Sequence, residues 1–418
     1  MKRKAANRQA TTTWDRESLS PGLYLHLPFC FSRCTYCDFH VGIFREDLSR
    51  QYVDSLEKEI DRLHRGGFSP KTIFVGGGTP SALGVQDWGR LLGLLGDRFS
   101  GDNLLEWTVE ANPDSLDPEK IEIALRSGVD RISTGAQTFS ARGLEILGRR
   151  HDAERVRQVH RWLEEFEMPR TSIDLIIGWP GQTESDVQHD VNSIVEIDPD
   201  HVSLYHLSYE QGTWLDEMRK RGQILPLDDE SFIGIARVAL GELKRAGYNR
   251  YEVSNLHLRG GPSLHNLNYW LRGQYIGVGS GAASFDGSKR WRNRPDIAAY
   301  IASEGFPERV DEETPSGVQE IEEHLMLSLR LLEGLSLERF RRETGVSLEE
   351  TASGALDRYT DLGWLERRGD RVSASDRGFE VLDEMILGLV EEVERGGLDG
   401  GTGPDLAGEA SQASLLGR

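Results

Sequence analysis

The sequence predicts an α/β protein: a partial (β/α)6 barrel followed by a helical, winged-helix-like domain. Short β-prone runs alternate with longer amphipathic patterns at intervals of roughly 25 to 50 residues, which is typical of βαβ units in a parallel sheet. Six such units fall short of the eight of a closed barrel, so the barrel is expected to be partial. Beyond residue 310 the order changes to helix, helix, short hairpin and helix, the order of a winged-helix module.

The six strands are expected where β-branched and aromatic residues gather in short runs, at 23–27, 72–75, 106–110, 131–134, 172–177 and 201–207. The helices between them place apolar residues on one face; in 47–64 these are Tyr52, Leu56, Ile60 and Leu63. The other helices are expected at 85–99, 118–127, 152–166, 184–197 (with Thr183 as its cap) and 228–246.

Five units are expected along the 418 residues, a length sufficient for two to three domains. They are a disordered leader (1–20), the barrel (21–255), an extension of the barrel (256–310), the winged-helix-like domain (311–394) and a disordered tail (395–418). In the fourth unit, helices are expected at 318–332, 348–362 and 376–394, with a hairpin before the last.

Composition argues against several classes of protein. The 49 Lys and Arg against 69 Asp and Glu give a net charge of −20, opposite to that of a free-standing nucleic-acid binder, so no nucleic-acid partner is expected. Mean hydropathy is −0.48 and no apolar run reaches spanning length, which predicts no integral membrane segment. The basic start of the chain lacks the apolar core of a secretory signal. An odd count of three cysteines indicates a reducing compartment, so we expect the cytoplasm.

The three cysteines, Cys30, Cys34 and Cys37, fall within eight positions, and this crowding predicts metal binding. Three thiolates can hold three irons of a [4Fe–4S] cluster and leave the fourth iron open to another ligand. With His40, the same residues could instead form a Cys₃His zinc site. The place of the segment, directly after the first barrel strand, favours the cluster.

Other chemically suggestive residues also come at strand ends, where a barrel carries its active site. A glycine run and Thr79 follow the second strand, Glu110 ends the third, Gln137 follows the fourth, and Asp174 lies in the fifth. We therefore expect a single site at the carboxyl edge of the sheet.

The pattern Cys-x₃-Cys-x₂-Cys, with Tyr36 before the third cysteine, resembles that of the radical S-adenosylmethionine (SAM) superfamily. Within it, the chain resembles the oxygen-independent coproporphyrinogen III oxidase group over roughly residues 22–385. The segments that carry this resemblance are YLHLPFC (24–30), GGGTPS (76–81), EANP (110–113), QTF (137–139) and DLIIG (174–178).

The resemblance implies that SAM chelates the open iron and that one electron, from an external donor, cleaves its S–C5′ bond. It implies that Tyr24 flanks the cluster and that Gly77, Gly78 and Thr79 approach the methionine part of SAM. It also implies SAM contacts for the polar residues Glu110, Gln137, Arg149 and Asp174, the last at the ribose hydroxyls.

Two departures set this chain apart from the oxidases. The oxidases carry a further cysteine two positions after the third ligand, where this chain has Phe39, and a longer segment before the cluster. The CDF sequence (37–39) and HNLNYW (265–270), followed by GVGSGA (277–282), resemble the HemW family of haem chaperones instead. This implies haem as a third bound group, with His265 as its candidate contact, and an acceptor protein that this resemblance does not identify.

Alternatives remain at this stage. His265 could be a buried, hydrogen-bonded structural residue rather than a haem contact. The protein could be a porphyrinogen oxidase, a radical SAM methyltransferase or a zinc-stapled interaction protein, and no catalytic residue is assigned. The winged-helix-like domain lacks a basic recognition face, so a packing or partner-binding role is expected for it.

Overall fold

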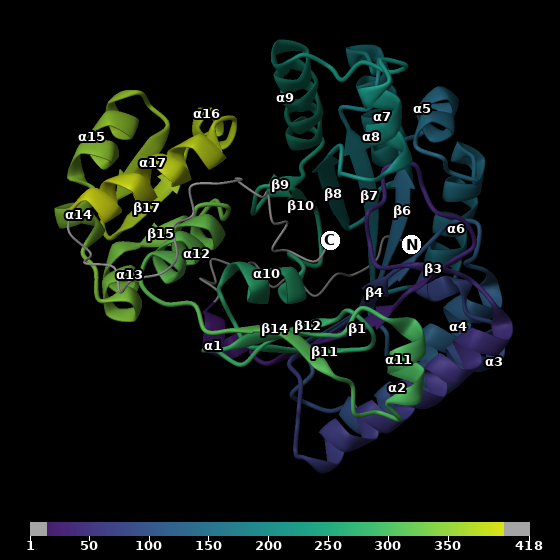
Figure 1. The fold of residues 1–418 in the computed structure, drawn as a ribbon. Helices are drawn as coiled ribbons and strands as arrows, with labels where there is room; N and C mark the ends of the chain where they lie inside the picture. Colours follow the sequence, from purple (N-terminus) through teal and green to yellow (C-terminus); the bar gives the residue numbers. More distant parts are fainter. Residues whose placement is uncertain (1–14, 397–418) are drawn as a thin grey trace.

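The computed structural model describes residues 15–396, which form a curved sheet with helices outside it and a smaller helical part to one side (Figure 1). The sheet has twelve strands in the order β14-β13-β12-β11-β1-β4-β5-β6-β7-β8-β10-β9. Its parallel centre is the predicted set of six strands: β1 (Gly22–Leu27), β4 (Thr72–Gly77), β5 (Glu106–Ala111), β6 (Arg131–Gln137), β7 (Arg170–Ile177) and β8 (His201–His206).

The strands alternate between two environments because successive side chains point to opposite faces. In β1, Leu23 and Leu25 are fully buried and belong to the same core cluster as Tyr52, Leu56 and Ile60 of the first long helix. The predicted helices are α2 (Glu46–Arg65), α3 (Val85–Phe99), α4 (Pro118–Ser127), α6 (Ala153–Glu165), α7 (Glu184–Ile197) and α9 (Asp229–Arg245). Thr183 caps α7 as predicted, within a capping box completed by Asp186.

Short elements lie in the loops that follow the carboxyl ends of the strands. They are β2 (Phe29–Cys30), β3 (Gly42–Ile43), η1 (Pro80–Ala82), α5 (Ala141–Ile146) and α8 (Trp214–Lys220). Because each spans only a few residues, no helical or strand periodicity marks it in the sequence.

The sheet continues beyond the six parallel strands on both sides. On one side β10 (Asn255–His257) pairs antiparallel with β8, and β9 (Asn249–Arg250) pairs antiparallel with β10; on the other, β11 (Tyr275–Val278) pairs parallel with β1. Beyond it lie β12 (Ala283–Phe285), β13 (Arg290–Asn293) and β14 (Arg309–Glu313), with α10 (Leu264–Trp270) and α11 (Ile297–Ala302) in the connections. The sheet thus continues across the expected domain boundary at residue 255. The domain boundaries at 255 and 310 remain proposals.

The C-terminal part has its own apolar core and a small sheet in the order β15-β17-β16. Two of its predicted helices are each broken in two, and one helix, α13, was not predicted. The elements are α12 (Val318–Ser328), β15 (Leu335–Ser336), α13 (Leu337–Thr344), α14 (Leu348–Thr351), α15 (Ser353–Asp361), β16 (Leu365–Arg368), β17 (Arg371–Ala374), α16 (Asp376–Phe379) and α17 (Leu382–Arg395). The predicted order of helices and hairpin is otherwise present.

The expected end of the disordered leader, at residue 20, is too far along the chain. Residues 16–19 form the short helix α1 (Arg16–Leu19), capped by Asp15, and Leu19 is fully buried against Leu264 and Leu267 of α10. One buried leucine in a polar stretch is too weak a periodic signal to show this from the sequence. Residues 1–14 of the expected leader and 397–418 of the expected tail lie outside the described residues. Within residues 15–396, no helix has both the length and the apolar character needed to cross a membrane.

Candidate functional site at the carboxyl edge of the sheet

A pocket lies at the carboxyl ends of the six parallel strands, and the loops after five of them and the last residues of β7 contribute to its lining. It brings together ten of the twelve residues expected from the sequence: Cys30, Cys34, Cys37, Gly77, Gly78, Thr79, Glu110, Gln137, Arg149 and Asp174. The other two, Tyr24 and His265, are not among its lining residues.

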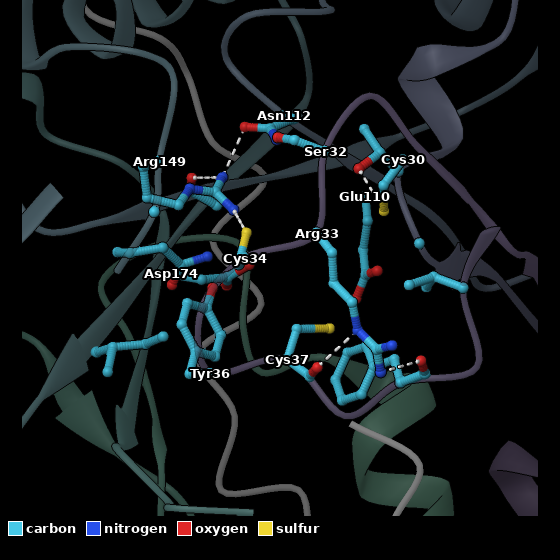
Figure 2. Close-up of a pocket in the computed structure, with 18 of the residues that line it drawn as sticks. Cys30, Ser32, Arg33, Cys34, Tyr36, Cys37, Glu110, Asn112, Arg149 and Asp174 are labelled. Carbon is cyan, nitrogen blue, oxygen red and sulfur yellow. Dashed lines mark hydrogen bonds between the residues drawn. The ribbon is translucent and has the colours of Figure 1, made fainter. Parts of the chain in front are cut away.

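The cysteine loop runs along one side of this pocket (Figure 2). Cys30 ends β2, which pairs with β3 on the far side of the loop, and Thr35 is held by a hydrogen bond from its hydroxyl to the Ile146 carbonyl. The Arg33 Nε donates to the Cys37 carbonyl at 3.0 Å. All three thiols are free and half-buried, and burial is the main cause that raises the pKa of Cys30 and that of Cys37, the latter to about 11.

Two side chains already donate to the cysteine sulfurs. Arg149 Nη1 lies 3.2 Å from Cys34 Sγ, and the Thr79 hydroxyl lies 3.4 Å from Cys30 Sγ. Arg149 is held in place by the Asn112 side chain at 2.6 Å and the Gly135 carbonyl at 2.8 Å (Figure 2). Arg149 thus places a fixed cation beside the cysteine loop.

The geometry distinguishes the two kinds of metal site, an iron–sulfur cluster and a zinc ion, that the sequence allowed for these cysteines. In the described part of the chain, no three His, Cys, Asp or Glu side chains converge as one metal ion would require. His40, the fourth zinc ligand of that alternative, instead bonds through Nε2 to the Ser280 hydroxyl at 2.9 Å. An iron–sulfur cube places three thiolates on three different irons, so cysteines spread along a pocket wall fit the cube better than a single zinc ion.

The glycine turn after β4 lies directly against the cysteine strand. Gly77 has φ of +106°, and a Cβ there would lie 2.5 Å from His26 Nδ1; a Cβ on Gly78 would lie 2.8 Å from the Phe29 backbone nitrogen. The Gly78 and Thr79 amides donate to the Leu27 and Phe29 carbonyls, both at 2.8 Å. Glycine is required because the turn and the cysteine strand touch backbone to backbone.

Two carboxyl groups, Glu110 and Asp174, line the same pocket. Burial, and then the charge of Asp174, raises the pKa of Glu110 to about 8, while burial raises that of Asp174 to about 6 against the hydrogen bonds of Ser203 and Ser133. The Ser133 hydroxyl donates to Asp174 Oδ1 at 3.0 Å. A ligand that brings positive charge or hydroxyl donors would relieve both effects, because each favours the ionised carboxylate.

His26 links the cysteine loop to the strands beneath it. Its Nε2 bonds to the His40 carbonyl at 3.0 Å, and since a carbonyl only accepts, Nε2 carries the proton. Burial is the main cause that lowers its pKa to about 4, so the ring is neutral and Nδ1 accepts from the Tyr24 hydroxyl at 3.1 Å. Tyr24 therefore contacts His26, which supports the cysteine loop, and does not line the pocket.

Replacing His26 with alanine is expected to loosen the cysteine loop without removing a ligand. Loss of two hydrogen bonds at a buried site costs on the order of 1 to 3 kcal/mol. We expect faster loss of iron to a chelator, followed by absorbance, than in the wild type. His160→Ala is the matched control, because His160 is equally buried but bonds to Thr134 on the other side of β6. Equal rates of iron loss in the two variants would show that His26 has no role in holding the loop.

His265 lies at the opposite end of the barrel from the pocket. It is fully buried in α10, next to Thr72 at the amino end of β4, whereas the pocket lies at the carboxyl end. Nδ1 lies 2.8 Å from the Thr72 hydroxyl and Nε2 lies 2.9 Å from the Tyr269 hydroxyl, so both nitrogens are used. The ring also stacks on Phe74 at 5.2 Å. In this structure His265 closes the floor of the barrel, and its contact with haem stays a prediction.

Several residues that line the pocket were not predicted from the sequence, among them Arg33, Ser133, Arg150, Tyr205 and His206. Ser133 and Tyr205 occupy inward positions of two predicted strands, on the same face of the sheet as Asp174. The alternation of side chains along each strand could therefore have indicated them. Nothing in the sequence marks the two arginines, because an isolated arginine in a loop is far more often a surface residue.

The chain is similar to known proteins along most of its length. Residues 24–194 match the model of the Radical SAM superfamily, and residues 317–381 match that of the HemN C-terminal domain. The heme chaperone HemW of Lactococcus lactis is 34% identical over 86% of this chain and 94% of its own. That of Bacillus subtilis is 33% identical over 87% and 97%. The solved structure of coproporphyrinogen III oxidase (HemN) from Escherichia coli has a TM-score of 0.76 at 20% identity, covering 90% of this chain and 91% of that one. This last similarity concerns the fold alone, and it confirms the predicted fold class.

Proposed function

The chain belongs to the HemW family of the radical SAM superfamily, and from this we propose that it is a haem chaperone which binds a [4Fe–4S] cluster, SAM and haem and transfers haem to an acceptor protein. The observation that carries the proposal is the set of three free cysteines, with no fourth in the chain, on the wall of a pocket whose other residues suit SAM.

Cys30, Cys34 and Cys37 would hold three irons and leave the fourth for SAM. When bound, the cluster supplies the electron for reductive cleavage of SAM. Arg149 is suited to the carboxylate of SAM because its guanidinium is fixed by Asn112 and its Nε has no hydrogen-bond partner among the described residues. This end of the pocket therefore combines anionic thiolates with a cation that offsets their charge.

At the other end of the SAM site, Asp174 would accept hydrogen bonds from the two ribose hydroxyls, and Glu110 would neutralise a cationic group of SAM. Gln137 and the turn of Gly77, Gly78 and Thr79 would complete the contacts. Tyr24 supports the site through His26. An electron donor for the cluster and an acceptor for haem are the protein partners that this activity needs, and the three free thiols suit the reducing cytoplasm.

The proposal can be tested on protein purified without oxygen. We expect about four irons and four sulfides per chain and a saturable change in the Soret band when ferric haem is added. Release of that haem to an added apo-haemoprotein would support transfer. No saturable Soret change would overturn the chaperone function. Decarboxylation of coproporphyrinogen III in the presence of SAM and reductant would identify an oxidase instead.

A further inference from the structure

β8 changes character where it reaches the pocket. Its first four residues are buried, but its last two, Tyr205 and His206, are exposed, and both line the pocket. His206 is the only histidine among the lining residues of this pocket. A histidine placed at the carboxyl end of a barrel strand is positioned for contact with a ligand rather than for packing.

The nitrogens of His206 are available. Within residues 15–396 its ring forms no hydrogen bond and packs edge-to-face against Phe232, with centroids 4.6 Å apart at 88°. The surrounding protein desolvates the ring where it faces the concave pocket, and this, with the charge of Arg250, lowers the pKa of His206 to about 4. At neutral pH the imidazole is therefore uncharged and retains a lone pair, which is the form that binds a metal.

The pocket around His206 has the surfaces that a flat, largely apolar ligand needs. Phe31 and Tyr205 are exposed by 39% and 38%, and Phe39 and Val41 are half-buried on the cysteine loop. Large aromatic side chains left exposed at a pocket indicate a binding surface, because their burial by a ligand is favourable. Phe31 is held by edge-to-face contact with Phe44 at 5.4 Å.

The pocket also offers a free positive charge. Arg150 is exposed and lines the pocket, and in the described part of the chain it forms no ion pair or hydrogen bond. Arg33 lies on the same rim but is held by the Cys37 and Phe39 carbonyls. An unpaired arginine is suited to carboxylates such as the propionates of a porphyrin.

We propose that His206 is the axial ligand of the haem iron, with the macrocycle against Phe31, Phe39 and Tyr205 and a propionate at Arg150. This rests on the proposed function and gives it a place: haem binds at the mouth of the same pocket whose inner wall carries the cysteines. Ligation forms one iron–nitrogen bond and involves no redox step.

The test is a titration of the full-length, cluster-containing protein with ferric haem. We compare the wild type with His206→Ala, with Tyr205→Phe, which removes a phenol oxygen that could ligate iron in place of His206, and with His189→Ala, an exposed histidine of α7 outside the pocket. His206→Ala is expected to shift the Soret maximum, to raise the Kd for haem about tenfold or more, and to regain the wild-type spectrum with added imidazole. His189→Ala is expected to keep the wild-type spectrum and Kd.

The outcomes distinguish this inference from the function on which it rests. If the wild type shows no saturable haem binding, the chaperone function itself fails. If the wild type binds haem and His206→Ala keeps its Soret maximum and Kd, or if Tyr205→Phe is the variant that loses the spectrum, haem binds elsewhere or through another ligand and the inference is overturned. Iron and sulfide content equal to that of the wild type shows that His206→Ala remains folded.

Discussion

Cys34→Ala is expected to leave the protein colourless, with iron and acid-labile sulfide falling from about four per chain to near zero. Cys34 lies in the middle of the ligand set and receives the hydrogen bond of Arg149 at 3.2 Å. With only three cysteines in the chain, no other thiol can replace it. Without this side chain, two cysteines remain for the cluster, and the Arg149 guanidinium loses its contact with sulfur. The effect is measured by iron and sulfide analysis of anaerobically purified protein.

Ser32→Ala is the matched control, because Ser32 lines the same pocket from the same loop but offers no thiolate. It should retain wild-type iron, sulfide and absorbance. A wild-type protein that contains one zinc ion and no iron would contradict the prediction and would restore the zinc alternative. Iron retained by Cys34→Ala would show that the cluster is held by other residues.

The barrel could be predicted because its signals are local and repeated. The strands at 72–75 and 106–110 are buried runs, and the amphipathic helices between them, such as α3, must cover the sheet. Once the strands are parallel, their carboxyl ends share one edge, so Glu110 and Asp174 can be placed together from the sequence alone.

Tertiary context decides the features that could not be predicted from the sequence. HNLNYW places an imidazole beside aromatic residues, which in the sequence suggests a haem site, but no local pattern says at which end of the barrel a segment docks. The structure places α10 at the amino end, where Tyr269 and Thr72 use both nitrogens of His265. His206 was not predicted from the sequence, because it is an isolated histidine at a strand end. Only its exposure in the structure distinguishes it.

The two ends of the barrel thus carry different kinds of polar group. At the carboxyl end, Arg149 and Glu110 line a pocket. The Arg149 Nε has no hydrogen-bond partner among the described residues, and the pKa of Glu110 is raised. At the amino end, Glu106 is fully buried and its oxygens accept from several donors at once. Groups of the first kind are available to ligands, whereas groups of the second kind hold the fold together.

Glu106→Leu is therefore expected to lower the free energy of unfolding by about 3 to 5 kcal/mol, because it removes one partner of a buried ion pair. Glu106 lies 3.0 Å from Arg131 and 3.2 Å from Arg170, and it accepts from the Leu264 and His265 amides, both at 3.1 Å. The variant leaves Arg131, which is 2% exposed, without a counter-charge and removes the acceptor for the first amides of α10. Urea unfolding followed by circular dichroism measures the change. Glu122→Gln, which breaks the exposed pair with Arg126 on α4, should change the midpoint little.

The pH dependence of this difference separates an ion pair from simple packing. Burial alone would raise the pKa of Glu106, but Arg131, Arg170 and the two amides more than offset it and hold the pKa below its ordinary value of 4.5. A lowered pKa adds stability above the unfolded value, and this contribution is lost as the pH falls through the folded value. The gap between wild type and Glu106→Leu should thus be full at pH 7 and narrow in acid, below pH 4.5. A gap independent of pH would mean that Glu106 acts through shape. Because the residue lies at the floor of the barrel, the iron content of the folded variant should equal that of the wild type, which places stability and cluster binding at opposite ends of the same strands.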